Sequence, residues 1–590
     1  MTSSFTLLGQ WRQAFLVIAV FAVYWGALDY PFHFDGIKGI QNNIVLDDIR
    51  RADLIWNHNP SRFLPNYSFA LNRHLGGLNT FGYHLVNVSL HAAVVLLLFH
   101  LVGLMFRAAG RLDGREPNPG RSENIQFTIA LLYAIHPLNT QAVTYLWQRC
   151  ATMSALFYFL AMAAYLKSSL DRLEGAPDIN WKQWRTISLG AAAAAMITKQ
   201  VSVTLPVALA LLEYTMISGS FSRFRQRIGS LLPFLPLLFV VPFLTFHYQT
   251  GEVMDLTYRK GELLSPLHYL LTQFNIIILY LKLLLLPIGQ NLDHVIPVVT
   301  SFWESAGSFA LLAALFMTGV WLIKINRMAS FGVIFFFLAM SVESSFFPIP
   351  DIVFEHRMYL PSVGLFLAFA AIVEKISFKW SSQAMGALVA LALVATVSLS
   401  VATIKRNQVW ATAESLWKDV VDKYPDSTRG LINLASVKKK SGKYEEAEKL
   451  YERVVVAGGG IAEVHHDLGV LKRLRGDLKG AEMNLRKARA LAPGGAITAL
   501  ELGKVLEAQG RLLEAGAEYV DAVNMAPRNL VARYKLADIL KIYGDTDSEQ
   551  KVYRGILELS PNDKFALKGL SSIQRKKGEA GAARKGDQRK

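Results

Sequence analysis

Residues 76–106 read GGLNTFGYHLVNVSLHAAVVLLLFHLVGLMF, and the part from 82 to 106 is an apolar run. The hydrocarbon core of a bilayer is about 30 Å thick and takes about 20 helical residues to cross, so this run is long enough. Similar runs recur until about residue 404. We therefore expect an all-α protein with a polytopic membrane bundle over residues 1–404.

Eleven apolar segments have the character of membrane spans. They lie near 14–29, 82–106, 125–138, 150–168, 186–198, 201–217, 230–247, 306–323, 329–347, 358–378 and 383–403. Arginines cluster at 107–121 and 223–227, and basic loops remain on the cytoplasmic side of a membrane. This orientation places the loop 30–81 and the chain after residue 404 outside.

A further apolar segment, 268–287, would invert everything that follows it if it crossed the membrane. We expect it to be re-entrant or to lie along the outer interface, where Lys282 could reach polar groups. The first apolar segment is not followed by a small-residue cleavage site, so we expect it to remain as an anchor.

The composition excludes other classes of protein. With 52% hydrophobic residues and a mean hydropathy of +0.28, the chain is too apolar for a soluble enzyme. A net charge of +16 would suit a nucleic-acid binder. However, the arginines lie between apolar runs without any nucleic-acid motif, so we expect no nucleic-acid partner. The single cysteine, Cys150, rules out an internal disulfide.

Residues 405–576 repeat with a period of 34. This period is typical of tetratricopeptide repeats, whose small residues let paired helices pack closely. Full repeats cover about 427–562, with one helix before them and a capping helix after, and the basic end 577–590 is expected to be disordered. The concave face of such a stack suits a protein or peptide partner, and a rigid spacer is the alternative. The residues that keep the spacing include Gly442, Gly476, Gly510 and Gly544, and Ala447, Ala481 and Ala515.

One carboxylate stands near the outer end of the first span, in the stretch YPFHFDGIKGIQNN of residues 30–43. An acid beside a membrane is costly unless it is paired or hydrated, so Asp35 is either functional or merely solvated. The other acids of this loop, Asp47, Asp48 and Asp53, fit solvated or capping positions.

Three other outward turns carry cations: Arg149, Lys199 and the pair His356 and Arg357. Arginine binds a phosphate with a bidentate fork and lysine binds it as a point charge, so their convergence would suit a phosphate. Snorkelling, or a salt bridge with Glu355, is the alternative for each one.

These motifs, in their order, resemble the transmembrane and tetratricopeptide repeat-containing O-mannosyltransferase-like family, in a bacterial form. The family is similar to the C-type glycosyltransferases, integral membrane enzymes that take a sugar from a polyprenyl-phosphate carrier on the outer side. The motifs are the Phe34–Asp35 segment with asparagine downstream, GGLNTFGYH at 76–84, HPLNTQAV at 136–143, Lys199, and EHRMYLPSVG at 355–364.

The resemblance implies a role for each of these residues. Asp35 would deprotonate the acceptor hydroxyl, and Arg149, Lys199, His356 and Arg357 would hold the phosphate of the lipid-linked donor. No metal or other cofactor is expected. The acceptor would be a protein or a glycan, at the periplasmic side of a bacterial inner membrane, and the repeats would bind a protein partner outside. The residues expected to support the site are His84, His136, Gln141, Glu355 and Tyr359.

The chemistry of the residues agrees with this implication. A hydroxyl is a poor nucleophile, and a positioned general base typically raises its rate of reaction by about 10² to 10⁴. Direct displacement would invert the anomeric carbon. Gly36, Gln141 and Gln200 stand where relatives often have acids, so an inactive member is one alternative. Transfer of a whole oligosaccharide and a non-catalytic scaffold for envelope or secretion components are the others.

Overall fold

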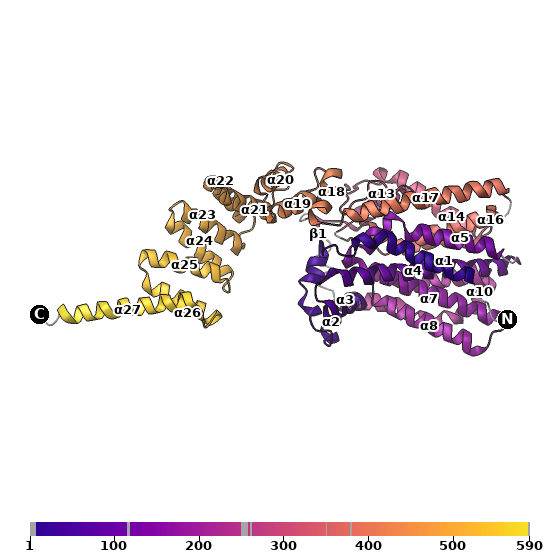
Figure 1. The fold of residues 1–590 in the computed structure, drawn as a ribbon, viewed down its shortest axis with the longest axis horizontal. Coiled ribbons are helices and arrows are strands. Elements are labelled where there is room, and N and C mark those ends of the chain that lie inside the picture. The colour runs from indigo at the N-terminus through magenta and orange to yellow at the C-terminus, as the bar shows by residue number, and fades with distance from the viewer. Residues whose placement is uncertain are drawn as a thin grey trace. The chain divides into compact units, whose positions relative to one another are not determined.

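The computed structural model describes residues 7–114, 118–248, 258–259, 262–349, 351–377 and 380–587 (Figure 1). Within these ranges the regular elements are helices, apart from two short antiparallel strands, β1 (Tyr258–Arg259) and β2 (Glu262–Leu263). The expected all-α class is therefore confirmed. The chain forms two compact units, Met1–Lys423 and Tyr424–Lys590.

The first unit is a bundle of long helices. Two rows of neighbours pack side by side, α17–α1–α4–α7–α8 and α4–α5–α16–α15–α14, and Figure 1 shows several of them running nearly parallel. Their bounds are α1 (Leu7–Tyr24), α4 (Thr80–Asp113), α5 (Pro119–Ala134), α7 (Arg149–Leu173), α8 (Asp178–Met196), α14 (Ala306–Leu322), α15 (Arg327–Met340), α16 (Ser362–Ser377) and α17 (Ser382–Gln408).

Five helical stretches among the described residues are long and apolar enough to cross a bilayer, and a bent pair brings the number to six. The other expected segments lie on shorter or more polar helices. Helix α5, for example, ends at Ala134 because Pro137 cannot continue a helix. The five are Thr80–Asp113, Leu146–Leu173, Gln200–Ser218, Pro266–Leu285 and Ser382–Gln408, and the pair is Phe221–Ser230 with Leu232–Tyr248, bent by 59°.

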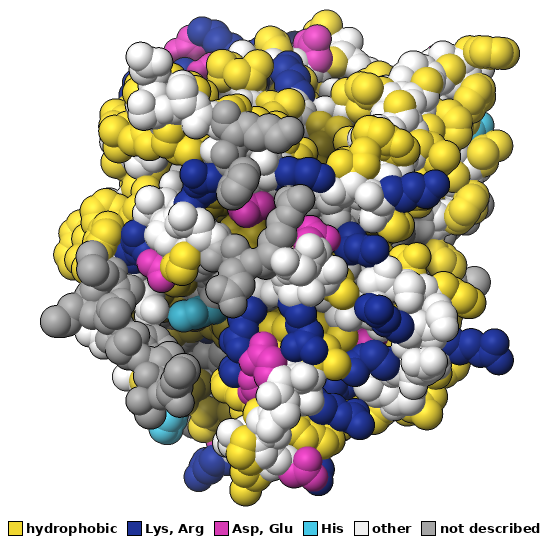
Figure 2. Space-filling view, turned by 90° about the vertical axis from the view of Figure 1, so that its right-hand side faces the viewer, with side chains coloured by type: hydrophobic (Ala, Val, Ile, Leu, Met, Phe, Trp, Pro, Cys, Tyr) yellow, Lys and Arg dark blue, Asp and Glu magenta, His cyan; other side chains and the backbone are white. Residues whose placement is uncertain are grey.

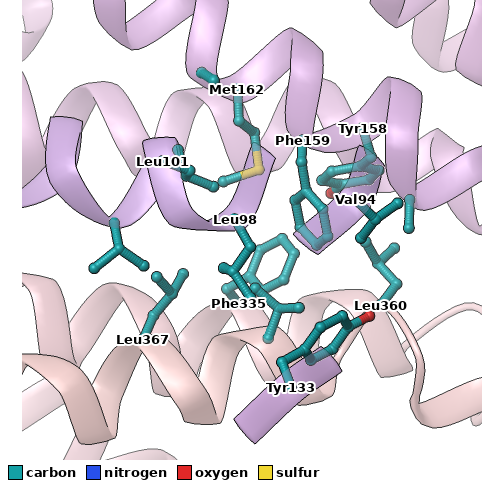
Figure 3. Packing of buried hydrophobic residues seen from close by; sticks show 14 of the residues in the cluster. Val94, Leu98, Leu101, Tyr133, Tyr158, Phe159, Met162, Phe335, Leu360 and Leu367 are labelled. Carbon is teal, nitrogen blue, oxygen red and sulfur yellow. The ribbon is translucent and has the colours of Figure 1, made fainter. Parts of the chain in front are cut away.

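The core of the bundle lies between its long helices, and Figure 3 shows part of this packing. Leu98 of α4, Phe159 of α7 and Phe335 of α15 are fully buried there. Helices α15 and α16 approach more closely still, because glycines face each other. A Cβ at Gly332 would lie only 2.2 Å from the carbonyl oxygen of Gly364. Small residues at such contacts allow membrane helices to pack backbone to backbone.

Helix α13 (Pro266–Leu285) corrects one expectation, because the segment is a single unbroken helix and not a re-entrant loop. It makes hydrogen bonds from its first turn to its last with segments that follow α5 and α15, so it lies along those segments. Its placement along the outer interface stays a prediction. The bonded pairs are Tyr269 with the Glu343 carbonyl (2.6 Å), Gln273 with Ile352 (3.1 Å), Tyr280 with Phe354 (2.9 Å) and Leu284 with His136 (2.9 Å).

The first unit continues beyond residue 404, where we expected it to end. Helix α17 continues to Gln408, and α18 (Ala413–Lys423) belongs to the same unit. The physical reason is Trp410, which is fully buried. Its ring stacks on Tyr145 with centroids 5.4 Å apart, and its carbonyl oxygen lies 2.7 Å from His33 Nε2.

Four helix pairs form the repeats of the second unit. Gly442, Gly476, Gly510 and Gly544 end the first helix of each pair with φ between 73° and 85°, a conformation that favours glycine. Residues 577–587, expected to be disordered, are helical instead, and 588–590 lie outside the described residues. The pairs are α19 (Thr428–Lys440) with α20 (Tyr444–Val456), α21 (Ala462–Leu474) with α22 (Leu478–Leu491), α23 (Ala496–Ala508) with α24 (Leu512–Met525), and α25 (Leu530–Tyr543) with α26 (Thr546–Leu559), followed by α27 (Lys564–Asp587).

The basic loops of the first unit meet at one end of the bundle. Arg107 pairs with Glu174, Arg185 donates to the Ser230 carbonyl oxygen at 2.9 Å, and Lys375 donates to that of Ile325. Figure 2 shows this end, where Lys and Arg side chains gather.

The segment that carries Asp35 lies toward the opposite end. His84, near the start of α4, contacts the Tyr30 carbonyl oxygen at 2.9 Å. Arg107 is on the same helix, about 35 Å farther along at 1.5 Å per residue. The bundle thus separates the basic loops from Asp35 by more than the thickness of a bilayer core.

Candidate functional site

Two buried histidines fix the segment that carries Asp35. The 2.9 Å contact of His84 Nε2 holds the backbone at Tyr30, and the 2.7 Å contact of His33 Nε2 holds the segment against Trp410. Burial lowers the pKa of His33, although its bond to Trp410 opposes this effect. A neutral His33 donates its Nε2 proton to the carbonyl. His84, through its contact with Tyr30, supports the backbone of the candidate site.

Asp35 forms a reciprocal pair with Tyr145. The Tyr145 hydroxyl donates to Oδ2 of Asp35 at 2.9 Å, and the backbone N–H of Asp35 donates to the same hydroxyl oxygen at 3.0 Å. Burial, and then the Asp35 carboxylate, raise the pKa of Tyr145 well above its ordinary value, so this hydroxyl remains a donor. The carboxylate is half-buried and held in one orientation.

The residue before Asp35 has an unusual backbone. Phe34 has a φ of 48°, and it is the one non-glycine residue with positive φ in the described part of the chain. This conformation costs on the order of 1 kcal/mol or more and occurs often at functional sites. The rings of Tyr145 and Trp417 hold it, with centroids 6.4 Å and 5.8 Å from that of Phe34.

Three of the predicted phosphate-binding residues line one small pocket: Lys199, His356 and Arg357. A carboxylate that the sequence analysis missed, Glu343, lies between the two cations. Its Oε1 is 2.8 Å from Lys199 Nζ, and its Oε2 is 3.9 Å from Arg357 Nε. Two cations beside one carboxylate favour its ionised form. The carboxylate is therefore ionised at neutral pH.

Arg62 adds a third cation to this group. Its charge acts on both Glu343 and His356, and its guanidinium lies 5.7 Å from the centre of the Trp147 ring. The Arg62 Nε is buried without a hydrogen-bond partner in the part of the chain that the structure describes. Lys199 and Arg357 thus face a single carboxylate, and Arg62 lies near enough for its charge to act on it, so this group of residues keeps an excess of positive charge.

His356 does not contribute a charge to the pocket. Burial, with the cations Lys199, Arg357 and Arg62, holds the pKa of His356 well below its ordinary value, so the ring is neutral. Gln141 orients it: Gln141 Oε1 accepts from the His356 backbone N–H at 2.7 Å and lies 3.2 Å from Nδ1.

Glu355 belongs to a different, fully buried network. Its Oε1 accepts from the Asn291 N–H at 2.6 Å and contacts His294 Nε2 at 2.9 Å, and its Oε2 accepts from Gln290 at 3.0 Å. Burial by itself raises the pKa of Glu355, but the bond from His294 and the charge of Arg406 outweigh it and lower the pKa. Glu355 therefore fixes the loop at 290–294 and forms no salt bridge with its neighbour Arg357.

Arg149 does not join the cation group, contrary to our expectation. It is fully buried, and all three guanidinium nitrogens have partners. Nε donates to Asn87 Oδ1 at 2.7 Å, Nη1 to Ser68 Oγ at 3.0 Å and Nη2 to the Tyr83 carbonyl at 2.9 Å. Its guanidinium also lies 4.2 Å from the centre of the Phe69 ring. Arg149 holds the loop 30–81 against the bundle.

The remaining predicted residues have structural contacts. His136 Nε2 contacts the Leu284 carbonyl at the end of α13 at 2.9 Å. The Tyr359 hydroxyl lies 2.6 Å from Nδ1 of His91, although Tyr359 also lines the pocket.

The Asp35 pair and the cation pocket are joined through one short segment. Gln141 contacts His356 in the pocket, and Tyr145, four residues later, contacts Asp35. Helix α6 (Thr140–Val143) ends between these two residues and Tyr145 is extended. Four residues span at most about 14 Å, so the two sites lie near each other. The charge of Asp351 also acts on Tyr145, and the Asp351 carbonyl accepts from Arg357.

Comparisons with known proteins agree with these features. Residues 428–455 match the family model described as Tetratricopeptide repeat. Protein O-mannosyl-transferase TMTC1 of Homo sapiens is 24% identical in an alignment 458 residues long, which covers 70% of this chain and 50% of that protein. Protein O-mannosyl-transferase F38B6.6 of Caenorhabditis elegans is 24% identical in an alignment 466 residues long, which covers 75% of this chain and 62% of that protein. The chain spans about half to three fifths of the length of these relatives.

One solved structure overlaps both units weakly. The crystal structure of ArnT from Cupriavidus metallidurans bound to undecaprenyl phosphate covers 85% of this chain and 81% of its own, at 15% identity and a TM-score of 0.34. A score this low carries no argument about the fold or the ligand of this chain.

The long apolar helices and the repeats define a multi-pass membrane protein with a tetratricopeptide domain. Over most of its length this protein is a homologue of the protein O-mannosyl-transferases, as the motifs predicted.

Proposed function

We propose that the protein is a membrane glycosyltransferase. It moves one sugar from a polyprenyl-phosphate carrier to a hydroxyl group of a protein or glycan. The observation that carries the proposal is the position of a fixed carboxylate, Asp35, near a pocket lined by two cations, Lys199 and Arg357, on which the charge of Arg62 also acts. The names of the relatives favour mannose as the sugar and protein as the acceptor.

Each group has a defined part in the reaction. Asp35 takes the proton of the acceptor hydroxyl as its oxygen attacks the anomeric carbon of the sugar. The bond from that carbon to the phosphate oxygen breaks, and the polyprenyl phosphate leaves with the electron pair. Lys199, Arg357 and Arg62 stabilise the negative charge that develops on this leaving group. A single displacement inverts the anomeric carbon.

The site faces the periplasm in this proposal, and the bundle has eleven spans. The basic loops at the opposite end of the helices support this orientation, because positive loops remain cytoplasmic. The contacts of α13 along its whole length support its place at the outer surface. An odd number of spans then puts the repeats outside, where their groove binds the acceptor or a partner protein.

Comparative glycoproteomics of the producing bacterium tests the proposal. Strains carry the wild-type protein, the Asp35→Asn variant or the Asp53→Asn variant. Asp53 is an exposed acid of the same loop and pairs with Arg51, so it is a matched control. We expect Asp35→Asn to lose the modified peptides at an unchanged protein level, and Asp53→Asn to keep them. Modification that persists in the Asp35→Asn strain would refute the role of Asp35.

A further inference from the structure

Glu343 occupies the cation pocket with its own carboxylate. Its side chain is only 15% exposed, and the side chains of Lys199 and Arg357 are 8% and 4% exposed. The 2.8 Å contact to Lys199 and the 3.9 Å contact to Arg357 are therefore largely shielded from water. Charge pairs in such surroundings interact more strongly than pairs on a surface.

The backbone of Glu343 is anchored, while its side chain reaches across the pocket. The residue follows the end of α15 in a segment without regular helix, and its carbonyl oxygen accepts from the Tyr269 hydroxyl at 2.6 Å. A side chain on a fixed backbone can leave the two cations by rotation about its own bonds, without a change in the fold.

The charge of Glu343 does not neutralise the cations of the pocket. Arg62 gives the group two more positive charges than negative ones, because His356 is neutral. The donor phosphate is a diester with one negative charge, whereas the polyprenyl phosphate that leaves is a monoester with up to two. The cations would therefore hold the product more tightly than the donor unless another anion competes with it. Lys199 and Arg357 cannot give their best geometry to both anions at once.

We propose that Glu343 is a tethered competitor for the donor-phosphate site: its carboxylate leaves Lys199 and Arg357 when the lipid phosphate binds, and returns to expel the polyprenyl phosphate after transfer. The inference rests on the proposed function and adds a residue that sets the affinity of that site. It explains how a pocket that must attract an anionic lipid also releases an anionic lipid product.

The test is binding of farnesyl phosphate, a short polyprenyl phosphate, to purified full-length protein in detergent, with farnesol as the uncharged comparison. Glu343→Gln keeps the shape of the side chain and removes its charge. We expect this variant to bind farnesyl phosphate about tenfold more tightly, which corresponds to ~1.4 kcal/mol, and to bind farnesol as the wild type does. Glu304→Gln is the matched control, because Glu304 caps the Ser301 N–H at 3.0 Å at the start of another helix.

Turnover gives a second readout that a merely structural role would not move. We expect Glu343→Gln to lower both KM for the donor and kcat, because the product leaves more slowly. If Glu343→Gln fails to fold, Glu343→Asp replaces it, since the shorter side chain loses its contact with Arg357 and should bind farnesyl phosphate about threefold more tightly.

The outcomes separate this inference from the proposed function. Equal or weaker binding of farnesyl phosphate by the folded Glu343 variant, with normal binding by the wild type, overturns the competitor role alone. Farnesyl phosphate binding that is unchanged in Lys199→Met overturns the phosphate site itself and therefore the proposed function. Failure of the wild type to bind farnesyl phosphate overturns both.

Discussion

Replacing Tyr145 with phenylalanine removes one oxygen atom that makes two hydrogen bonds with Asp35. The hydroxyl donates to the carboxylate at 2.9 Å and accepts from the Asp35 N–H at 3.0 Å. A hydrogen bond to a charged group is worth about 1.5–3 kcal/mol, and each 1.36 kcal/mol in a barrier is tenfold in rate. If the bond serves to aim the base, kcat should fall by about 10- to 100-fold in Tyr145→Phe.

The assay is transfer of labelled sugar from a polyprenyl-phosphate donor by purified protein, with kcat and KM measured separately. KM for the donor should change little, because Tyr145 contacts Asp35 and is not among the described residues that line the phosphate pocket. The ring should remain stacked on Trp410, so the variant should fold. Tyr67→Phe, in the same outward loop, is the control. A kcat within about twofold of wild type would refute the idea that Tyr145 positions the base.

Two further predictions concern stability. Gly39→Ala should lower the free energy of unfolding by about 1–3 kcal/mol, because its Cβ would lie 2.4 Å from the Trp147 ring, whereas Gly36→Ala, whose Cβ has no neighbour closer than 3.9 Å, should not. Gly332→Ala should lower the melting temperature in detergent through its clash with α16, and Gly386→Ala, with open space around it, should not; equal effects would contradict the packing.

The repeats could be predicted from the sequence because their evidence is local and periodic. Each turn needs a left-handed residue, so glycine recurs every 34 residues, as at Gly442 and Gly476. The all-helical class could be predicted for a similar reason, because the length of each apolar run is visible in the sequence and indicates a membrane helix. The number of spans is harder to predict from the sequence. Breaks such as the one at Pro137 shorten a helix, so that one crossing of the bundle is made by two consecutive segments.

The candidate site could be predicted only in part, because its contacts join distant segments. A cation on an outward turn looks the same in sequence whether it faces a pocket, as Lys199 does, or a set of acceptors, as Arg149 does. The three partners of Arg149 come from three separate positions in the chain, so only the fold reveals them. The sequence did contain one indication of Glu343, because it is an acid within the apolar segment 329–347.

The sequence contained no comparable indication of Tyr145 or Arg62. Tyrosine is common near membrane surfaces, and an arginine in a polar loop is ordinary. Their importance comes from a hydroxyl 2.9 Å from Asp35 and from a charge that acts on Glu343, which are properties of the folded chain.

The central claim is that Asp35 is the base of a sugar transfer whose phosphate leaves from the neighbouring cation pocket. The most direct measurement is the single-turnover rate of transfer by purified Asp35→Asn at saturating donor, together with its binding of farnesyl phosphate. We expect a rate at least about 100-fold below wild type with unchanged binding. A rate within about threefold of wild type would contradict it.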